Sequence, residues 1–335
     1  MWHLGIDLHR YTVVIAAMND AGEVRPAVRF ECSRADEIQA YCQQFCPFRA
    51  VIEATSTYRW LYMLLSPIGT VLLAHPFRLR AMVQRRSKTD RLDAMLLAQL
   101  LRINQIPLAY VPSQRYQTLR ETTRQRCRLT SAQTQAKQAL RWLLARHNLQ
   151  APYKCPFGPR GLYWFRRMDF GPVDNPIRDE LLERLQHFDR QLAAMDARLE
   201  ELRPQYPEAA VLTELYGIGL FSALMMIAEF GDVSRFRRAK QAGAYTGLTP
   251  RVEQSGSHCY VGHISRQGSP WLRWVLLEAA MKIIHHDIGL ANFYTRIRKR
   301  SSAKIARVAT ARKLAEICWK RLFRWQHEHS EVAVA

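Results

Sequence analysis

Acidic side chains are scarce in this chain of 335 residues, which carries 29 Asp and Glu against 49 Lys and Arg and has a net charge of +20. Such a charge balance is typical of a protein that binds a polyanion. Long apolar runs are also lacking. The longest charge-free windows cover residues 60–77 and 215–228, and the first is interrupted by Ser66, Pro67 and Gly69. Neither window is a convincing membrane span, so no membrane partner is expected.

Paired cysteines are missing as well. The seven cysteines are an odd number without any Cys-x-x-Cys spacing, which argues against a zinc site and favours reduced thiols in a cytoplasm. The first ten residues include Asp7 and Arg10, and they lack an apolar stretch followed by a small-residue cleavage site. The sequence therefore predicts no export signal and a cytoplasmic location.

The cationic excess is concentrated in two blocks. Residues 76–150 carry fifteen basic and three acidic side chains, and residues 241–335 carry fifteen and six. The segments 1–75 and 151–240 are close to neutral. Two basic faces that contact one large polyanion would give this pattern, and nucleic acid is the leading candidate. An anionic membrane surface is less favoured, because no basic amphipathic helix with a clean apolar face is present.

The N-terminal part predicts a mixed α/β domain over residues 1–105. Short apolar and β-branched runs predict strands, and longer periodic segments predict helices. The predicted order is strands at 2–8, 11–18 and 23–30, a helix at 35–45, a strand at 50–53, a helix at 58–65, a strand at 70–74 and a final helix after it. This order is that of a ribonuclease-H/RuvC-like fold.

The middle of the chain, residues 106–203, predicts a helical coiled-coil region. Residues 112–147 look helical, and Arg120, Arg124 and Arg128 share one face at a spacing of four residues, which suggests nucleic-acid binding. A second helix begins at Asn175 and Pro176. It carries a heptad seam that consists of Leu181, Leu185, Phe188, Leu192, Met195, Leu199 and Leu202. The seam can pair within the chain or between subunits, and we favour dimerisation. The aromatic connection at 153–171 has no assigned role.

Four carboxylates occur at ends of predicted elements: Asp7, Glu53, Asp90 and Asp93. The first two end neighbouring strands, and a three-residue step places the last two on one helix face. Clustered carboxylates repel one another unless a hard cation lies among them, and their oxygens suit magnesium. Two such ions ~3.5–4 Å apart could clamp a phosphate. The basic residues just before the helix, Arg85, Arg86 and Lys88, are expected to contact nucleic acid.

Residues 204–335 predict a separate, mainly α-helical domain. Gly217 and Gly219 lie in a stretch that resembles a helix-hairpin-helix element, whose glycines let a phosphate approach a helix N-terminus. Residues 247–257 predict a flexible loop with serines beside Arg251, and Arg266 follows in a second Gly/Ser stretch. A serine in a mobile basic loop can attack a phosphodiester.

The motifs GIDLHR, IEAT, KTDRLDA, Gly-Ile-Gly, AYTGLTP, Ser-Gly and GHISRQG occur in this order. Together they resemble the Piv-type DEDD transposases of the insertion-sequence 110 family, recombinases guided by a structured bridge RNA. The resemblance implies that the DEDD acids are Asp7, Glu53, Asp90 and Asp93, which bind Mg²⁺, and that Ser255 is the nucleophile of a C-terminal transposase domain. It also implies target and donor DNA, a guide RNA, a dimer or tetramer with a composite site, and a prokaryotic nucleoid.

The leading hypothesis is therefore an RNA-guided site-specific DNA recombinase that forms a covalent phosphoserine. One alternative is a RuvC-like structure-selective nuclease that uses metal-activated water, and another is a non-catalytic RNA-binding scaffold. Ser257 stands close to Ser255 and is a second candidate nucleophile. The general base is open among Glu253, His258 and a metal-bound hydroxide, and Arg251 and Arg266 could instead give electrostatic help.

Overall fold

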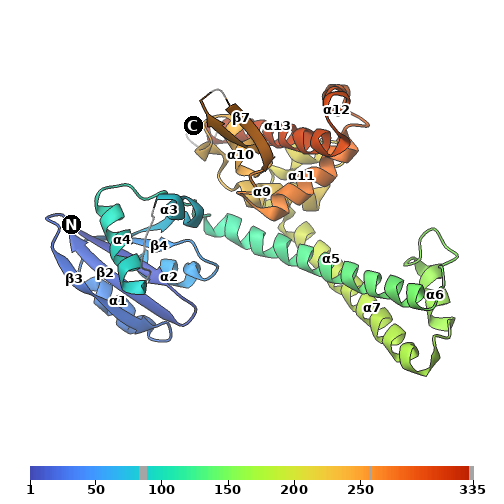
Figure 1. The fold of residues 1–335 in the computed structure, drawn as a ribbon, viewed down its shortest axis with the longest axis horizontal. Helices are drawn as coiled ribbons and strands as arrows, with labels where there is room; N and C mark the ends of the chain where they lie inside the picture. The colour runs from blue at the N-terminus through green and yellow to red at the C-terminus, as the bar shows by residue number, and fades with distance from the viewer. Residues whose placement is uncertain (83–88, 257, 332–335) are drawn as a thin grey trace. The chain divides into compact units, whose positions relative to one another are not determined.

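The computed structural model describes residues 1–82, 89–256 and 258–331. The chain divides into two compact units, Met1–Val111 and Pro112–Ala335 (Figure 1). Each unit has its own buried apolar core, and each is described by itself below. The further division of the second unit at residue 203 stays a prediction.

Unit 1 is built on a five-stranded mixed sheet with the order β3-β2-β1-β4-β5. The strands are β1 (Trp2–Leu8), β2 (Thr12–Asn19), β3 (Val24–Glu31), β4 (Phe48–Glu53) and β5 (Thr70–Ala74). β1, β2 and β3 are antiparallel, whereas β1, β4 and β5 are parallel. The predicted mixed α/β architecture is confirmed, and this sheet is consistent with a RuvC-like fold.

Helices cover both faces of this sheet. They are α1 (Ala35–Gln43), α2 (Tyr58–Leu65), α3 (Pro76–Met82) and α4 (Asp90–Arg102). Leu4, Ile6 and Leu8 of β1 share a buried cluster with residues of α1 and α2. The alternate residues Gly5 and Asp7 lie on the opposite face, which α4 covers. This alternation decides that the Asp7 carboxylate meets α4.

Gly5 is the point where α4 crosses β1. A Cβ atom at this position would lie 2.0 Å from the carbonyl oxygen of Ala94 and 2.3 Å from the amide nitrogen of Ala98. Any side chain would therefore push the helix off the strand. The missing side chain lets the backbone of α4 pack directly on β1.

Unit 2 begins with a long antiparallel helical hairpin. Its helices are α5 (Gln114–Arg146) and α7 (Gly171–Leu202), and the short α6 (Pro159–Arg167) lies in the connection between them (Figure 1). The heptad residues Leu181, Leu185 and Leu199 are buried, and α7 packs against α5 of the same chain. The first of the two predicted pairings is thus present in the structure. Dimerisation through this seam stays a prediction.

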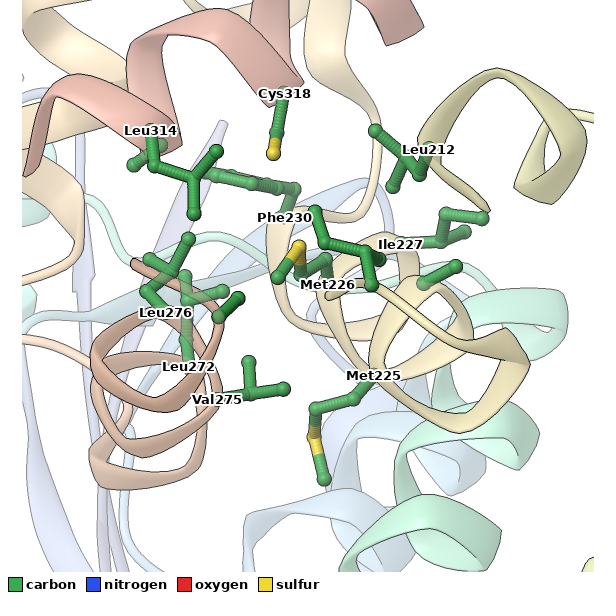
Figure 2. Packing of buried hydrophobic residues seen from close by; sticks show 14 of the residues in the cluster. Leu212, Met225, Met226, Ile227, Phe230, Leu272, Val275, Leu276, Leu314 and Cys318 are labelled. Atoms are coloured by element: carbon green, nitrogen blue, oxygen red, sulfur yellow. The ribbon is translucent and has the colours of Figure 1, made fainter. Parts of the chain in front are cut away.

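The remainder of unit 2 is mainly helical, as predicted. It contains η1 (Arg203–Gln205), α8 (Ala209–Thr213), α9 (Leu220–Phe230), η2 (Val233–Arg235), α10 (Ala239–Tyr245), β6 (Pro250–Ser255), β7 (His258–Ile264), α11 (Pro270–Ile283), α12 (Ile288–Arg300) and α13 (Ala303–Glu331). Helix α9 is almost wholly buried, because its residues Met226 and Phe230 pack against Leu276 of α11 and Leu314 of α13 (Figure 2).

The prediction of a flexible loop at residues 247–257 is wrong. Residues Pro250–Ser255 and His258–Ile264 form a two-stranded antiparallel hairpin. Gly256 adopts a φ of 58° in the tight turn, which an L side chain rarely adopts. The serine-containing segment is therefore a β-hairpin with a defined register.

The described part of the chain has neither a cross-link nor a membrane-spanning helix. All seven cysteines are free. In residues 1–82, 89–256 and 258–331, no helix combines the length and the apolarity that a bilayer crossing needs.

Candidate active site

The predicted acids of unit 1 begin with Asp7, near the C-terminal end of β1. Its residue exposure is only 8%, and it pairs across the sheet with Val14 of β2. β4 runs parallel to β1, with Ile6 beside Ile52, so Glu53 ends β4 at the same edge of the sheet. The predicted meeting of Asp7 and Glu53 follows from this register.

Asp90 and Asp93 lie in the first turn of α4. Thr89 is the N-cap of this helix, and its side-chain oxygen accepts a hydrogen bond from the amide of Leu92 at 3.3 Å. Carboxylates are favoured at a helix N-terminus, because the peptide dipoles and free N–H groups there attract negative charge. The close crossing at Gly5 then holds the two acids near the C-terminal end of β1.

The pKa of Asp7 responds to the charges of the other three acids. Burial raises the pKa of this carboxyl above its ordinary value, His9 opposes the rise, and the charges of Asp90, Asp93 and Glu53 add to it. Like charges brought together at a partly buried position are typical of functional sites. Glu53, Asp90 and Asp93 therefore lie within electrostatic reach of Asp7.

His9 is a member of this group that sequence reasoning missed. Its Nε2 atom lies 3.2 Å from Oδ2 of Asp7 and 3.2 Å from Oδ1 of Asp90. The ligand atoms of these three residues all lie within 4.8 Å of one another. The signal in the sequence was the position of His9 in GIDLHR, just beyond a strand that ends at a carboxylate.

This donor set fits a divalent cation. The carboxylate oxygens of Asp7 and Asp90 are hard ligands of the kind that magnesium and manganese prefer, and a cation would remove the repulsion between them. An imidazole nitrogen adds a ligand type that manganese accepts more readily than magnesium. Asp7, His9 and Asp90 are thus a candidate metal site, with Glu53 and Asp93 beside it.

The arginines predicted on one face of α5 differ in their surroundings. Arg120 is buried and donates hydrogen bonds from Nε to the carbonyl oxygen of Ala228 and from Nη2 to that of Glu229. Arg124 donates to both carboxylate oxygens of Glu229, at 2.7 and 2.9 Å. Arg128 is exposed. Arg120 and Arg124 thus connect α5 to α9, and the prediction that they form a nucleic-acid surface is corrected. Of the three arginines, only Arg128 remains a candidate nucleic-acid contact.

The basic residues Arg85, Arg86 and Lys88, which were expected beside the acids, lie outside the described residues. The two glycines predicted to contact phosphate, Gly217 and Gly219, lie before α9. Gly217 has a φ of 83°, and a Cβ atom there would lie 2.6 Å from that of Lys282. Gly219 is the exposed N-cap of α9. Their predicted contact with phosphate stays a prediction.

Ser255 is the last residue of β6. It is exposed, and it lies directly opposite His258 across the β-hairpin. A shallow hollow of about 460 Å³ at this end of the hairpin is lined by Gln254, Ser255, His258, Cys259 and Tyr260. Ser257, the other candidate nucleophile, lies outside the described residues. The structure thus gives Ser255 an accessible position beside an imidazole.

The two predicted arginines near the serine belong to the base of the hairpin. Arg251 is exposed and contacts the carbonyl oxygen of Ser265 at 3.5 Å, and Arg266 is exposed with a φ of 55°. Arg273, which the sequence did not point to, donates from Nη1 to the carbonyl oxygens of Thr246, Arg266 and Gly268. This guanidinium fixes the loop that carries Arg266.

Comparisons with known proteins match both units. One family model, described as a transposase model of the DEDD IS110 type, matches residues 4–148, and a second, described as the transposase IS116/IS110/IS902 family, matches residues 209–295. The first range contains the four acids, and the second contains Ser255. Together the two models cover more than half of the chain.

Three relatives are similar at low identity. A "Transposase for insertion sequence element IS1328" of Yersinia enterocolitica is 26% identical over 94% of this chain and 95% of its own length. A "Probable family 20 transposase" of Pseudomonas aeruginosa is 25% identical over 96% of both chains. A "Transposase for insertion sequence element IS1111A" of Coxiella burnetii is 28% identical over 45% of this chain and 42% of its own. Because two transposase models of this family match residues 4–148 and 209–295, the chain belongs to the IS110 family of transposases.

Proposed function

We propose that this protein is an RNA-guided, site-specific DNA recombinase that cuts and rejoins strands through a covalent bond between DNA and Ser255. The observation that carries the proposal is the gathering of three other acids around Asp7. Asp90 and Asp7 have ligand atoms within 4.8 Å, and the charges of Asp90, Asp93 and Glu53 raise the pKa of Asp7. Membership of a transposase family supports DNA as the substrate. The exposed serine beside His258 supports a protein nucleophile.

The acids act on the phosphate. Asp7, Glu53, Asp90 and Asp93 would hold Mg²⁺, and the bound ion would supply positive charge to balance that of the scissile phosphate. Asp7 and Asp90 are fixed by β1 and by the first turn of α4, so their oxygens are oriented before the substrate arrives. Asp7 is only 8% exposed, so electrostatic interactions of its carboxylate are screened less than those of a carboxylate in water.

The serine carries out the exchange of strands. Its Oγ attacks phosphorus, the bond to the leaving deoxyribose oxygen breaks, and a diester between Ser255 and the DNA end forms. The hydroxyl of a second strand then attacks the same phosphorus, which releases Ser255 and restores the number of phosphodiester bonds. His258 lies opposite Ser255 and is the described residue best placed to accept the serine proton. Arg251 lies on the same hairpin and can balance charge on the phosphate.

A composite active site brings several chains together. The acids belong to unit 1 and the serine to unit 2, so the acids of one subunit can serve the serine of another in a dimer or tetramer. Target DNA, donor DNA and a structured guide RNA would occupy the two basic blocks, at 76–150 and 241–335. Base pairing with the guide would select the target.

One alternative has an observation in its favour. Asp7, His9 and Asp90 form a candidate metal site within unit 1, without Ser255. A RuvC-like nuclease would use such a site to direct water at a phosphodiester, and no covalent intermediate would form. A non-catalytic RNA-binding scaffold, by contrast, would leave the gathering of four acids without a purpose.

A denaturing gel after incubation with end-labelled DNA separates these functions. The recombinase predicts a protein-bound DNA band in the wild type that disappears in Ser255→Ala and persists in Ser301→Ala, a matched change at another exposed serine of unit 2. Asp7→Asn should abolish cleavage while DNA binding is retained. Clean strand hydrolysis by Ser255→Ala would favour the nuclease, and unchanged activity of Asp7→Asn would favour the scaffold.

A further inference from the structure

The connection between α5 and α7 folds into a small module, which we call the hairpin tip (residues 141–170). Phe165 and Phe170 of the connection are buried in one cluster with Leu140 and Leu144 of α5 and Leu185 of α7. This cluster is separate from the large core around α9. The hairpin tip lies at the end of α5 that is remote from α9, about 25 Å along the helix from Arg124 (Figure 1).

A buried carboxylate fixes the geometry of the hairpin tip. Asp174, which is 4% exposed, accepts hydrogen bonds from Nη2 of Arg146 at 2.9 Å and from Nε2 of His147 at 2.7 Å. The end of α5 is thereby fastened to the start of α7. Such a pairing keeps the two helix ends in one arrangement, because separating them would leave the buried carboxylate of Asp174 poorly compensated.

The charge of this region is almost entirely positive. No Asp or Glu occurs between residues 122 and 168, whereas ten Lys and Arg do. The hairpin tip contains one acid, the exposed Asp169, and Arg146 pairs with Asp174. Its other exposed basic side chains are Arg141, Lys154, Arg160, Arg166 and Arg167. Such a surface attracts a polyanion.

Large aromatic side chains are exposed within this positive surface. Trp142 is 65% exposed and Tyr163 is 59% exposed. Arg160, Tyr163 and Arg167 recur at steps of three and four residues, so they share one face of α6. Arg167 donates from Nη1 to the Tyr163 hydroxyl at 2.7 Å, and its guanidinium lies 5.5 Å from the centre of that ring.

We propose that the hairpin tip binds an unpaired stretch of nucleic acid. Bases would stack on Trp142 and Tyr163, and phosphates would contact Arg160, Arg166 and Arg167. Flat rings can stack only on bases that are not already stacked within a duplex, which is why the ligand is single-stranded. The buried face of α6 is its apolar face, with Phe165, so α6 offers no aliphatic surface to a membrane.

This site goes beyond the proposed strand exchange and depends on that function only for its class of ligand. Stacking and phosphate contacts are common to RNA and DNA, so single-stranded RNA and DNA of one sequence are separate arms of the test. The test uses the full chain in a chelating buffer, where no cleavage occurs. Failure of the phosphoserine mechanism would therefore leave the result of this test unchanged.

The test compares two double variants by fluorescence anisotropy with labelled 20-nucleotide single strands and with the matching duplex. Trp142→Ala/Tyr163→Ala should bind single strands at least about 10-fold more weakly than the wild type, whereas Trp142→Phe/Tyr163→Phe, which keeps the rings, should stay within about 3-fold. Duplex binding should change little in both. Arg184→Ala, on the exposed face of α7, is the charge control.

Photo-cross-linking gives a second readout that other basic surfaces cannot supply. A single strand containing 4-thiothymidine or 4-thiouridine should attach to peptides that contain Trp142 or Tyr163 in the wild type. Both alanine changes are at exposed positions, so the thermal unfolding midpoint should be preserved. Wild-type affinity of the double alanine variant, or cross-links confined to other peptides, would overturn the proposal. If the double alanine variant lost affinity equally for duplex and for single strands, the proposal would be overturned. A loss of affinity confined to vesicles of anionic lipid would overturn it as well.

Discussion

A Cβ atom on Gly5 would lie 2.0 Å from the carbonyl oxygen of Ala94, so the first strand and the helix that carries Asp90 and Asp93 meet backbone to backbone. This contact decides how far those two acids lie from Asp7. No rotamer could relieve such a clash, because the contacted atoms belong to the helix backbone. The geometry of the acidic site therefore depends on a glycine that holds no ligand itself.

Gly5→Ala should lower the free energy of unfolding by about 3 kcal/mol, at the upper end of the usual cost of overpacking. It should also weaken divalent-cation binding, because α4 must move outward. Urea unfolding and cation titration measure the two effects. Gly158→Ala is the matched control, because a Cβ atom there would meet its nearest neighbour at an ordinary 3.5 Å. Wild-type stability of Gly5→Ala would contradict the close crossing.

Burial and the neighbouring acids raise the pKa of Asp7 above its ordinary value of 3.8. A raised pKa means that the folded chain binds more protons than the unfolded chain between the two values, so stability falls as pH rises through that window. Without added metal, Asp7→Asn should therefore stabilise the protein at pH 7, and the gain should shrink as pH falls toward 3.8. Urea unfolding at several pH values checks this. A destabilised Asp7→Asn protein at pH 7 would contradict the raised pKa.

Divalent cations should stabilise the wild-type protein by binding only the folded state. At a concentration of one hundred times Kd the gain is about 2.7 kcal/mol, which raises the midpoint of thermal unfolding. Asp90→Asn should lose most of this gain, because Asp90 supplies one of the clustered ligand atoms. Asp196→Asn, an exposed acid of α7 paired with Arg126, should keep it. Equal shifts in both variants would mean that the cation binds elsewhere.

Removing the contact between Arg124 and Glu229 should destabilise the protein. The Glu229 side chain is 1% exposed, and Arg124 meets it in a bidentate pair. Arg124→Ala should lower the free energy of unfolding by about 3 kcal/mol, because a buried carboxylate loses a partner. Arg184→Ala, which removes an exposed pair with Glu180, should cost less than about 0.5 kcal/mol. If Arg124→Ala instead reduced only nucleic-acid affinity, the packing role would be wrong.

Much of unit 1 could be predicted from the sequence, because its strands are apolar runs and its acids follow them at element ends. The meeting of His9 with Asp90 could not, since it depends on how closely α4 approaches β1 at Gly5. The spacing of residues along one helix shows which of them share a face, but it does not show which element packs against that face.

The C-terminal unit shows the same limit. Arg120 and Arg124 looked like one basic surface, yet their partner Glu229 lies over one hundred residues further along the chain. Glycine and serine suggested a loop at 247–257, whereas two polar strands pair there and Gly256 makes the turn. Local composition cannot reveal a hairpin whose strands are stabilised by each other.

The covalent recombinase mechanism is tested most directly by peptide mass spectrometry. The wild-type protein is incubated with an excess of DNA substrate and the reaction is then quenched, which traps the complex. After nuclease and protease digestion, the mechanism predicts a nucleotide mass attached through phosphate to Ser255, and no such mass in the Asp7→Asn protein. Wild-type strand cleavage without any such modified peptide, or with the nucleotide on another residue, would contradict it.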